Sequence, residues 1–288
     1  MIEEQSFELE TSGAGWLPED DKPEHWSYED KLKPLLVASA VMELPAGSQY
    51  MDKGGNVDLR PFSSPVHSQR HTSSCVAQSV VKALEIKRIM AGHEHVDLSR
   101  LAVYYLAREL MFPMRTNADK GTFISLACDV LRRFGVCPEA DWPWDLQNIY
   151  TPPSWKSMRK AYLGKIEAFY KIRSTDQERV GEVRRCLLAG HPVVFGTEVG
   201  ANWALYRSYN PLREEPLTVP SVKTGRHAIC IVGFQSNGNF IIENSWGMSW
   251  GHDGFGYLAP EVIASDKSND FWIIKGGWEE YKAKADGQ

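Results

Sequence analysis

The chain has 288 residues, a formal net charge of −5, 43% hydrophobic residues and ten tryptophans. A chain of this size can bury a substantial core as one large domain or as two lobes. The charges are spread along the sequence, no apolar run approaches membrane-spanning length, and no metal-binding motif occurs. We therefore expect no nucleic-acid partner, no membrane segment, no metal and no cofactor.

The first 56 residues are polar and irregular, but they contain Trp16, Trp26 and the short apolar run 35–38. These aromatic residues argue against a purely disordered tail. We expect residues 1–56 to form an N-terminal extension that packs on, or covers, the rest of the chain. Two interpretations stay open: an integral part of the fold, or a segment that blocks a cleft.

The compact part of the chain is predicted to begin at residue 57, and its first half is mainly helical. Apolar residues recur at helical spacing in three segments, and a glycine or proline follows each of them. Ser73 or Ser74 can cap the first of these helices. The predicted helices cover about residues 75–90, 101–111 and 123–134.

The second half changes to short β-rich runs separated by Gly and Asn turns, which is typical of an antiparallel barrel or sheet. One short helix, 180–188, interrupts them. The predicted fold class is α+β, with a helical lobe at about 66–160, a β lobe at about 161–280, and a ligand cleft between them. The predicted strands cover residues 165–173, 193–195, 228–234, 240–242, 256–258 and 271–274.

Three residues suggest nucleophilic chemistry. Cys75 lies in the first turn of a predicted helix, where the helix dipole favours the thiolate. His227 precedes the strand 228–234, and Asn244 follows the next predicted strand, so the two can lie side by side. A neutral amide would orient the imidazole without adding charge, which suits a thiolate–imidazolium pair. Taken singly, each residue could equally have a structural role.

The order of these residues resembles the papain-like cysteine peptidases. Gln69 lies six residues before Cys75, Arg226 precedes His227, and the run 244–251 reads Asn-Ser-Trp-Gly-x-x-Trp-Gly, a highly specific motif. The resemblance covers about residues 57–275. It implies a catalytic domain at 57–288 with a papain-like two-lobe fold, a helical left lobe and an antiparallel β-barrel right lobe.

The N-terminal part adds a detail to this resemblance. The runs 15–18 and 57–60 look like bacterial members of the family, which have a short N-terminal extension. Thr72 stands where the family has a disulfide cysteine.

The N-terminus is acidic and lacks the features of a secretory signal, and an odd number of widely spaced cysteines suits reduced thiols. We therefore expect a cytoplasmic protein. The five cysteines are Cys75, Cys128, Cys137, Cys186 and Cys230.

The resemblance also implies roles for individual residues. Cys75 would attack a peptide carbonyl, His227 would protonate the leaving amine, and Asn244 would orient His227. The Gln69 amide and the Cys75 backbone N–H would stabilise the oxyanion. Trp246 could also shield the His–Asn hydrogen bond from water. The residues expected to contact a peptide or protein substrate are Ser73, Ser74 and Trp246.

The residues leave alternatives to peptide hydrolysis open. The same site would serve a transpeptidase or amide ligase, in which an amine replaces water at the thioester. A catalytically silent peptide-binding homologue is a third interpretation, motivated by the altered turn before Cys75 and by Arg226. The sequence predicts neither the peptide preference nor the oligomeric state.

Overall fold

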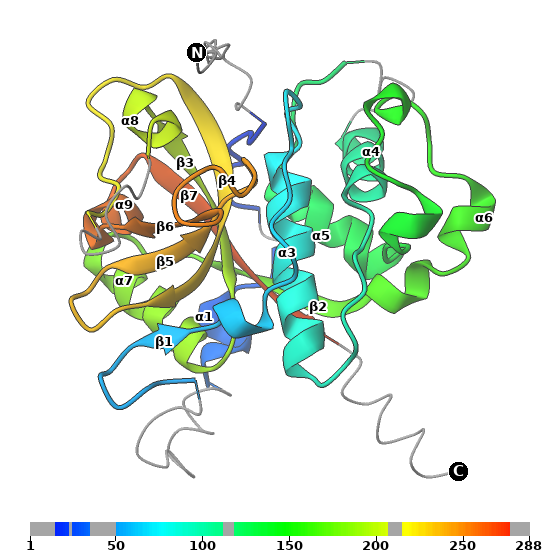
Figure 1. The fold of residues 1–288 in the computed structure, drawn as a ribbon. Coiled ribbons are helices and arrows are strands. Elements are labelled where there is room, and N and C mark those ends of the chain that lie inside the picture. The colour runs from blue at the N-terminus through cyan, green and yellow to red at the C-terminus, as the bar shows by residue number, and fades with distance from the viewer. Residues whose placement is uncertain (1–14, 23–24, 35–49, 112–117, 207–214, 277–288) are drawn as a thin grey trace, which may run out of the picture.

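The computed structural model describes residues 15–22, 25–34, 50–111, 118–206 and 215–276. Figure 1 shows helices on one side, a β-sheet on the other, and helix α3 (Cys75–Met90) along the boundary between them. The α+β class is therefore confirmed. The apolar run 35–38 lies outside the described residues.

The helical side is built around α3. This helix is buried along almost its whole length, since α4 and α5 pack on one side of it and the sheet packs on the other. It ends at Met90, and two residues later Gly92 has a φ of 79°, the left-handed conformation that favours glycine after a helix. The three helices predicted in the first half of the compact part agree with the structure within one residue at each end. The main helices are α3, α4 (Arg100–Met111) and α5 (Ile124–Arg133), followed by the short α6 (Trp155–Met158).

The sheet has seven strands, all in antiparallel pairs, in the order β2-β7-β3-β4-β5-β6, with β1 paired to β4. The two-residue strand β1 was not predicted from the sequence. The strands are β1 (Val57–Asp58), β2 (Ile166–Ile172), β3 (Val193–Val199), β4 (Gly225–Phe234), β5 (Phe240–Glu243), β6 (Phe255–Leu258) and β7 (Ser268–Gly276). Helices α7 (Asp176–Leu188), α8 (Ala201–Ala204) and α9 (Pro260–Ala264) complete this side.

Strand pairing brings the site residues together. Because β4 and β5 are antiparallel neighbours, the start of β4 lies beside the end of β5. His227 is near the start of β4, and Asn244 directly follows β5. The two residues therefore meet at one end of the sheet, as the sequence predicts.

The described part of the N-terminal extension, which includes the short helix α1 (Tyr28–Lys31), contacts both the helical side, where Trp16 pairs with Thr122, and the sheet. Figure 1 draws it in blue along the junction of the helices and the sheet. Tyr28 is fully buried, and Ser27 pairs with Lys171 of β2. The division into an extension at 1–56 and a domain at 57–288 stays a prediction.

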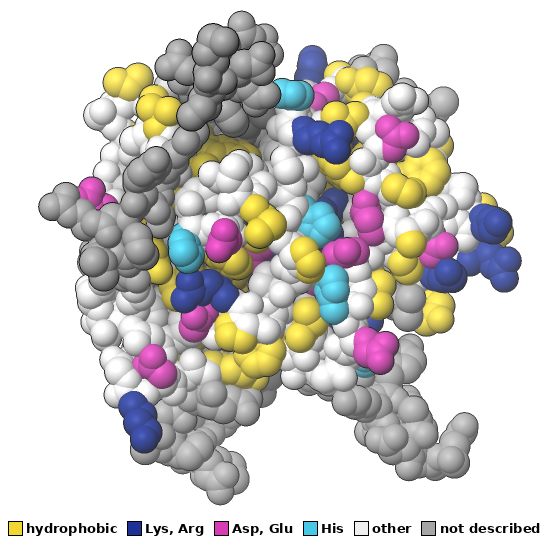
Figure 2. Space-filling model, viewed as in Figure 1, with side chains coloured by type: hydrophobic (Ala, Val, Ile, Leu, Met, Phe, Trp, Pro, Cys, Tyr) yellow, Lys and Arg dark blue, Asp and Glu magenta, His cyan; other side chains and the backbone are white. Residues whose placement is uncertain are grey.

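Two general properties bear on location and ligands. All five cysteines are free and buried. In the part of the chain that the structure describes, no helix is both long and apolar enough to cross a membrane, and no cluster of His, Cys, Asp and Glu could hold a metal ion. Figure 2 shows acidic and basic side chains intermixed over one face of the molecule. The cytoplasmic location stays a prediction.

Candidate active site

Cys75 is the first residue of α3, and its side chain is fully buried at the junction of the helices and the sheet. The backbone N–H of Ala228, on β4, donates a hydrogen bond to Cys75 Sγ at 3.4 Å. One turn further along α3, the Ser79 hydroxyl donates to the Ala228 carbonyl at 3.0 Å. These bonds fix the start of α3 against β4, so the sulfur lies beside the residue that follows His227.

His227 and Asn244 form a close pair. Nε2 of the His227 ring lies 2.7 Å from Asn244 Oδ1, and the backbone N–H of Ser245 donates to the same oxygen at 2.8 Å. Since an amide oxygen only accepts, Nε2 must carry the proton in this hydrogen bond. Trp246 stacks on the ring, with centroids 4.6 Å apart and planes at 30°, a position that limits the access of water.

Gln69 is held in the turn before α3 by both ends of its amide. Its Oε1 accepts a hydrogen bond from the Ser245 hydroxyl at 2.6 Å, and its Nε2 donates to the Thr72 carbonyl at 2.7 Å. An amide nitrogen has two N–H groups, so one bond to Thr72 leaves the other for an anion. Ser245 directly follows Asn244 in the chain, so its hydrogen bond to Gln69 links Gln69 to Asn244.

The two serines before Cys75 have different surroundings. Ser74 occupies the N-cap position of α3, but its hydroxyl makes no capping bond and instead shares a 2.7 Å hydrogen bond with Thr72 Oγ1. Ser74 is fully buried, so its side chain points into the turn rather than toward a substrate. Ser73 is partly exposed, and its carbonyl group lies against Gly15 of the N-terminal segment.

Asp119 anchors this turn, a role that the sequence analysis missed. Its two carboxylate oxygens each accept the Ser73 backbone N–H at 3.0 Å, and the Tyr104 hydroxyl donates to the same carboxylate. Hydrogen bonds to a carboxylate are stronger than those between neutral groups. They tie the turn to the loop before α5, close to Thr72, where the resemblance places a family disulfide.

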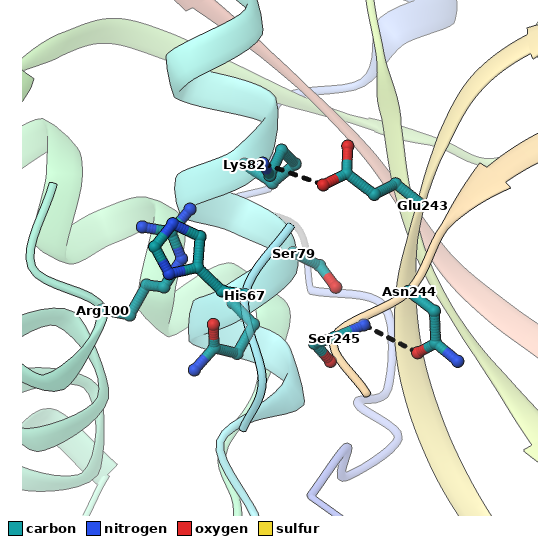
Figure 3. A pocket seen from close by; sticks show the side chains of 8 residues that line it. His67, Ser79, Lys82, Arg100, Glu243, Asn244 and Ser245 are labelled. Atoms are coloured by element: carbon teal, nitrogen blue, oxygen red, sulfur yellow. Dashed lines mark hydrogen bonds and ion pairs between the residues drawn. The ribbon is translucent and has the colours of Figure 1, made fainter. Parts of the chain in front are cut away.

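A network of buried charges lies behind Asn244 (Figure 3). Lys82 Nζ on α3 is 2.8 Å from Glu243 Oε1 on β5, and Arg100 Nη2 is 2.7 Å from Glu85 Oε2. Burial raises the pKa of Glu243 more than Lys82 lowers it. Burial acts in the same direction on Glu85, but Arg100 and Lys82 together outweigh it and lower the pKa. The Lys82–Glu243 pair thus joins the two lobes directly beside Asn244.

The N-terminal segment reaches the site at Gly15. A Cβ on Gly15 would lie 2.0 Å from the Ser73 carbonyl oxygen, so only glycine fits in this pose. The Thr122 backbone N–H donates to Gly15 O at 3.0 Å, and the Leu17 N–H donates to Thr122 O at 3.2 Å. The segment therefore pairs, like an added strand, with the loop that faces the turn before Cys75.

Burial changes the ionisation of the thiol. Burial raises the pKa of Cys75 to about 12, and hydrogen bonds from the backbone N–H groups of Ala228 and Gly15 oppose the increase. From the sequence, the helix dipole was expected to favour the thiolate. In this conformation burial outweighs that effect, and the pKa of the thiol lies above its ordinary value.

The chain belongs to the papain family of cysteine proteases, whose sequence pattern matches residues 55–265. It is 29% identical to an uncharacterized peptidase C1-like protein of Acanthamoeba polyphaga mimivirus, over 70% of this chain and 67% of the viral protein. It is 35% identical to a putative cathepsin L 3 of Paramecium tetraurelia, over 72% of this chain and 59% of that protein.

The fold is similar to solved members of this family. The crystal structure of xylellain, a cysteine protease from Xylella fastidiosa, matches with a TM-score of 0.72 and 28% identity, over 92% of this chain and 97% of that one. The papain-like two-lobe fold that the sequence predicts is therefore confirmed. The curated relatives are longer than this chain, which spans about 60% to two thirds of those two.

Proposed function

We propose that this protein is a cysteine peptidase that cleaves peptide bonds through a thioester on Cys75. The observation that carries the proposal is the 2.7 Å contact between His227 Nε2 and Asn244 Oδ1, beside a buried cysteine at a helix start. Membership of the papain family supports the same chemistry. The substrate class is a peptide or protein, as expected from the sequence.

The proposed reaction starts from the tautomer of His227. Asn244 holds the proton on Nε2, so Nδ1 is the ring nitrogen that exchanges a proton with the Cys75 sulfur. The thiolate attacks the peptide carbonyl carbon and forms an S–C bond. His227 then gives its proton to the leaving amine as the C–N bond breaks. Water, deprotonated by His227, hydrolyses the thioester and regenerates the thiol.

Gln69 and the Cys75 backbone N–H are the proposed oxyanion donors. The Gln69 amide is held by Ser245 and Thr72 before any substrate arrives, so no reorganisation is needed as negative charge develops on the carbonyl oxygen. Ser73, whose backbone is fixed by Asp119, is the turn residue that we propose to contact the substrate. Trp246 stacks on the ring of His227, and its partly exposed side chain stays a proposed contact of the substrate.

We further propose that residues 15–22 keep the enzyme latent in this conformation. Gly15 presents an N–H group to the sulfur, and a hydrogen-bond donor is no target for a nucleophile. The segment also occupies the backbone edge of Thr122, with which a peptide could otherwise pair. Catalysis therefore requires the segment to leave the cleft.

The test combines turnover with labelling. The full-length protein is incubated with a broad peptide library and, separately, with a thiol-directed epoxide. We expect cleavage and labelling of Cys75, and loss of both in a Cys75→Ala variant. Cys128→Ala is the matched control, because Cys128 is also fully buried but lies outside the site. Because the covered wild type can be silent, the deciding sample is the Gly15→Ala variant, whose new Cβ would clash with the Ser73 carbonyl oxygen and displace the segment. A folded Gly15→Ala protein that neither cleaves nor labels, with or without added amines as acceptors, would contradict the proposal.

A further inference from the structure

The N-terminal segment fills a recess beside the nucleophile with the side chain of Trp16. Trp16 is only 3% exposed. Its ring lies flat against Gly196 of β3, where a Cβ would be 2.0 Å from ring atom Cε2. Because residue 196 is glycine, there is space here for an aromatic ring. The side chain of any other residue at this position would occupy that space.

A buried carboxylate closes the end of this recess. The indole Nε1–H of Trp16 donates to Asp270 Oδ2 at 3.1 Å, and the backbone N–H of Glu19 donates to the same oxygen at 3.0 Å. Asp270 is 1% exposed. Both donors belong to the N-terminal segment, so both leave with it. Asp270 Oδ2 then needs a new donor, because a buried acceptor without a partner is costly.

The charge of Asp270 is already balanced. Lys171 Nζ lies 3.0 Å from Asp270 Oδ1, and the two side chains are 5% and 1% exposed. Asp21, the other carboxylate near Lys171 at 3.8 Å, belongs to the segment and leaves with it. The remaining Lys171–Asp270 pair is neutral. An added cation would place an uncompensated charge in a buried site, whereas a neutral N–H donor would not.

The position of the recess suits a substrate side chain. Trp16 is the neighbour of Gly15, which covers Cys75, and the residues on both sides of Trp16 pair with the backbone of Thr122. A peptide that pairs with the same edge would direct one side chain into the recess. We propose that this recess selects a neutral aromatic side chain with a ring N–H, tryptophan, through Asp270 and Gly196. The inference rests on the proposed peptidase function.

The first test needs no catalysis. In the full-length Trp16→Ala variant, the affinities of indole, 1-methylindole and phenylguanidine are measured by calorimetry and thermal shift. We expect indole to bind at least about tenfold more tightly than 1-methylindole, which lacks the N–H, and than the cationic phenylguanidine. Trp26→Ala is the matched control, because Trp26 belongs to the same segment but is 47% exposed. Equal binding of the two indoles, or preference for the cation, would overturn the inference.

The second test needs no variant. Peptides that differ only in one residue, Trp, 1-methyl-Trp, Phe or Arg, are compared in kcat/KM with the full-length wild type. The ratios are independent of the fraction of uncovered enzyme, which scales every rate equally. We expect Trp to exceed 1-methyl-Trp by about tenfold or more. Cleavage without this preference refutes the recess alone. Selective indole binding without cleavage of any peptide, in the wild type and in Gly15→Ala alike, supports the recess and refutes the peptidase.

Discussion

Replacing Gly15 by alanine should activate the enzyme without touching its catalytic residues. The new Cβ would lie 2.0 Å from the carbonyl oxygen of Ser73. Ser73 cannot easily retreat, because its backbone N–H is bound to both oxygens of Asp119. The N-terminal segment must therefore yield. Overpacking of this kind costs about 1–3 kcal/mol, which corresponds to a rise of about 5- to 150-fold in the uncovered population.

The assay follows the thiol directly. The rate of Cys75 alkylation by iodoacetamide is measured at low reagent concentration, where it reports the uncovered fraction, and is compared with peptide turnover. We expect both rates to rise by the same factor in Gly15→Ala, because both require the segment to leave the cleft.

The matched control is Gly181→Ala, since a Cβ on Gly181 of α7 would meet no atom within 4 Å. This variant should leave both rates unchanged. A folded Gly15→Ala protein with wild-type alkylation and turnover would refute the cover. So would a rise in alkylation without any rise in turnover, because the sulfur would then be exposed without a working site.

Three further predictions concern the site itself. First, burial gives the Cys75 thiol a pKa of about 12, above its ordinary 9.0. The covered state is therefore favoured fully below pH 9 and loses that advantage as pH rises toward 12. The midpoint of the alkylation pH profile should lie at a lower pH in Gly15→Ala than in the wild type. Second, Asn244→Ala should lower kcat by about 10- to 1000-fold with little change in KM, because His227 loses the acceptor that fixes its tautomer. A higher KM with an unchanged kcat would contradict this role. Third, Lys82→Met should lower the free energy of unfolding by about 3–5 kcal/mol, because it leaves the buried carboxylate of Glu243 unpaired, and adding Glu243→Gln should restore part of the loss in urea denaturation; additive losses would show that the pair is not coupled.

The secondary structure was predictable where apolar residues are periodic. The helix at 75–90 and the strand at 228–234 agree with α3 and with the interior of β4. The helix predicted at 180–188 begins earlier, at Asp176. Its start was missed because the first turn is polar and shows no apolar pattern. Strand β3 likewise runs beyond Phe195, through small and polar residues that the pattern does not reveal.

The meeting of His227 and Asn244 could be predicted from the sequence because it depends only on which strands are neighbours. Two adjacent antiparallel strands place His227 beside Asn244, and a specific motif follows. What the sequence could not show are contacts between polar residues far apart in the chain. The bonds from Trp16 to Asp270 and from Ser73 to Asp119 depend on tertiary packing and leave no local pattern.

The same limit applies to the N-terminal extension. Composition indicates that residues 1–56 are not a purely disordered tail, but it does not say where they dock. The glycine at 15 reads as an ordinary turn residue until the structure puts it against Ser73 and Cys75. Close approach of two backbones is the reason for glycine here, and such an approach is visible only in three dimensions.

The central claim is that Cys75 carries the acyl group of a cleaved peptide. It is tested most directly by acid-quenching the Gly15→Ala enzyme during turnover of a peptide ester and measuring the intact mass, followed by peptide mapping. We predict an added mass equal to the acyl group, located on Cys75 and absent in Gly15→Ala/Cys75→Ala. Turnover with no added mass, or with the acyl group on another residue, would contradict the account.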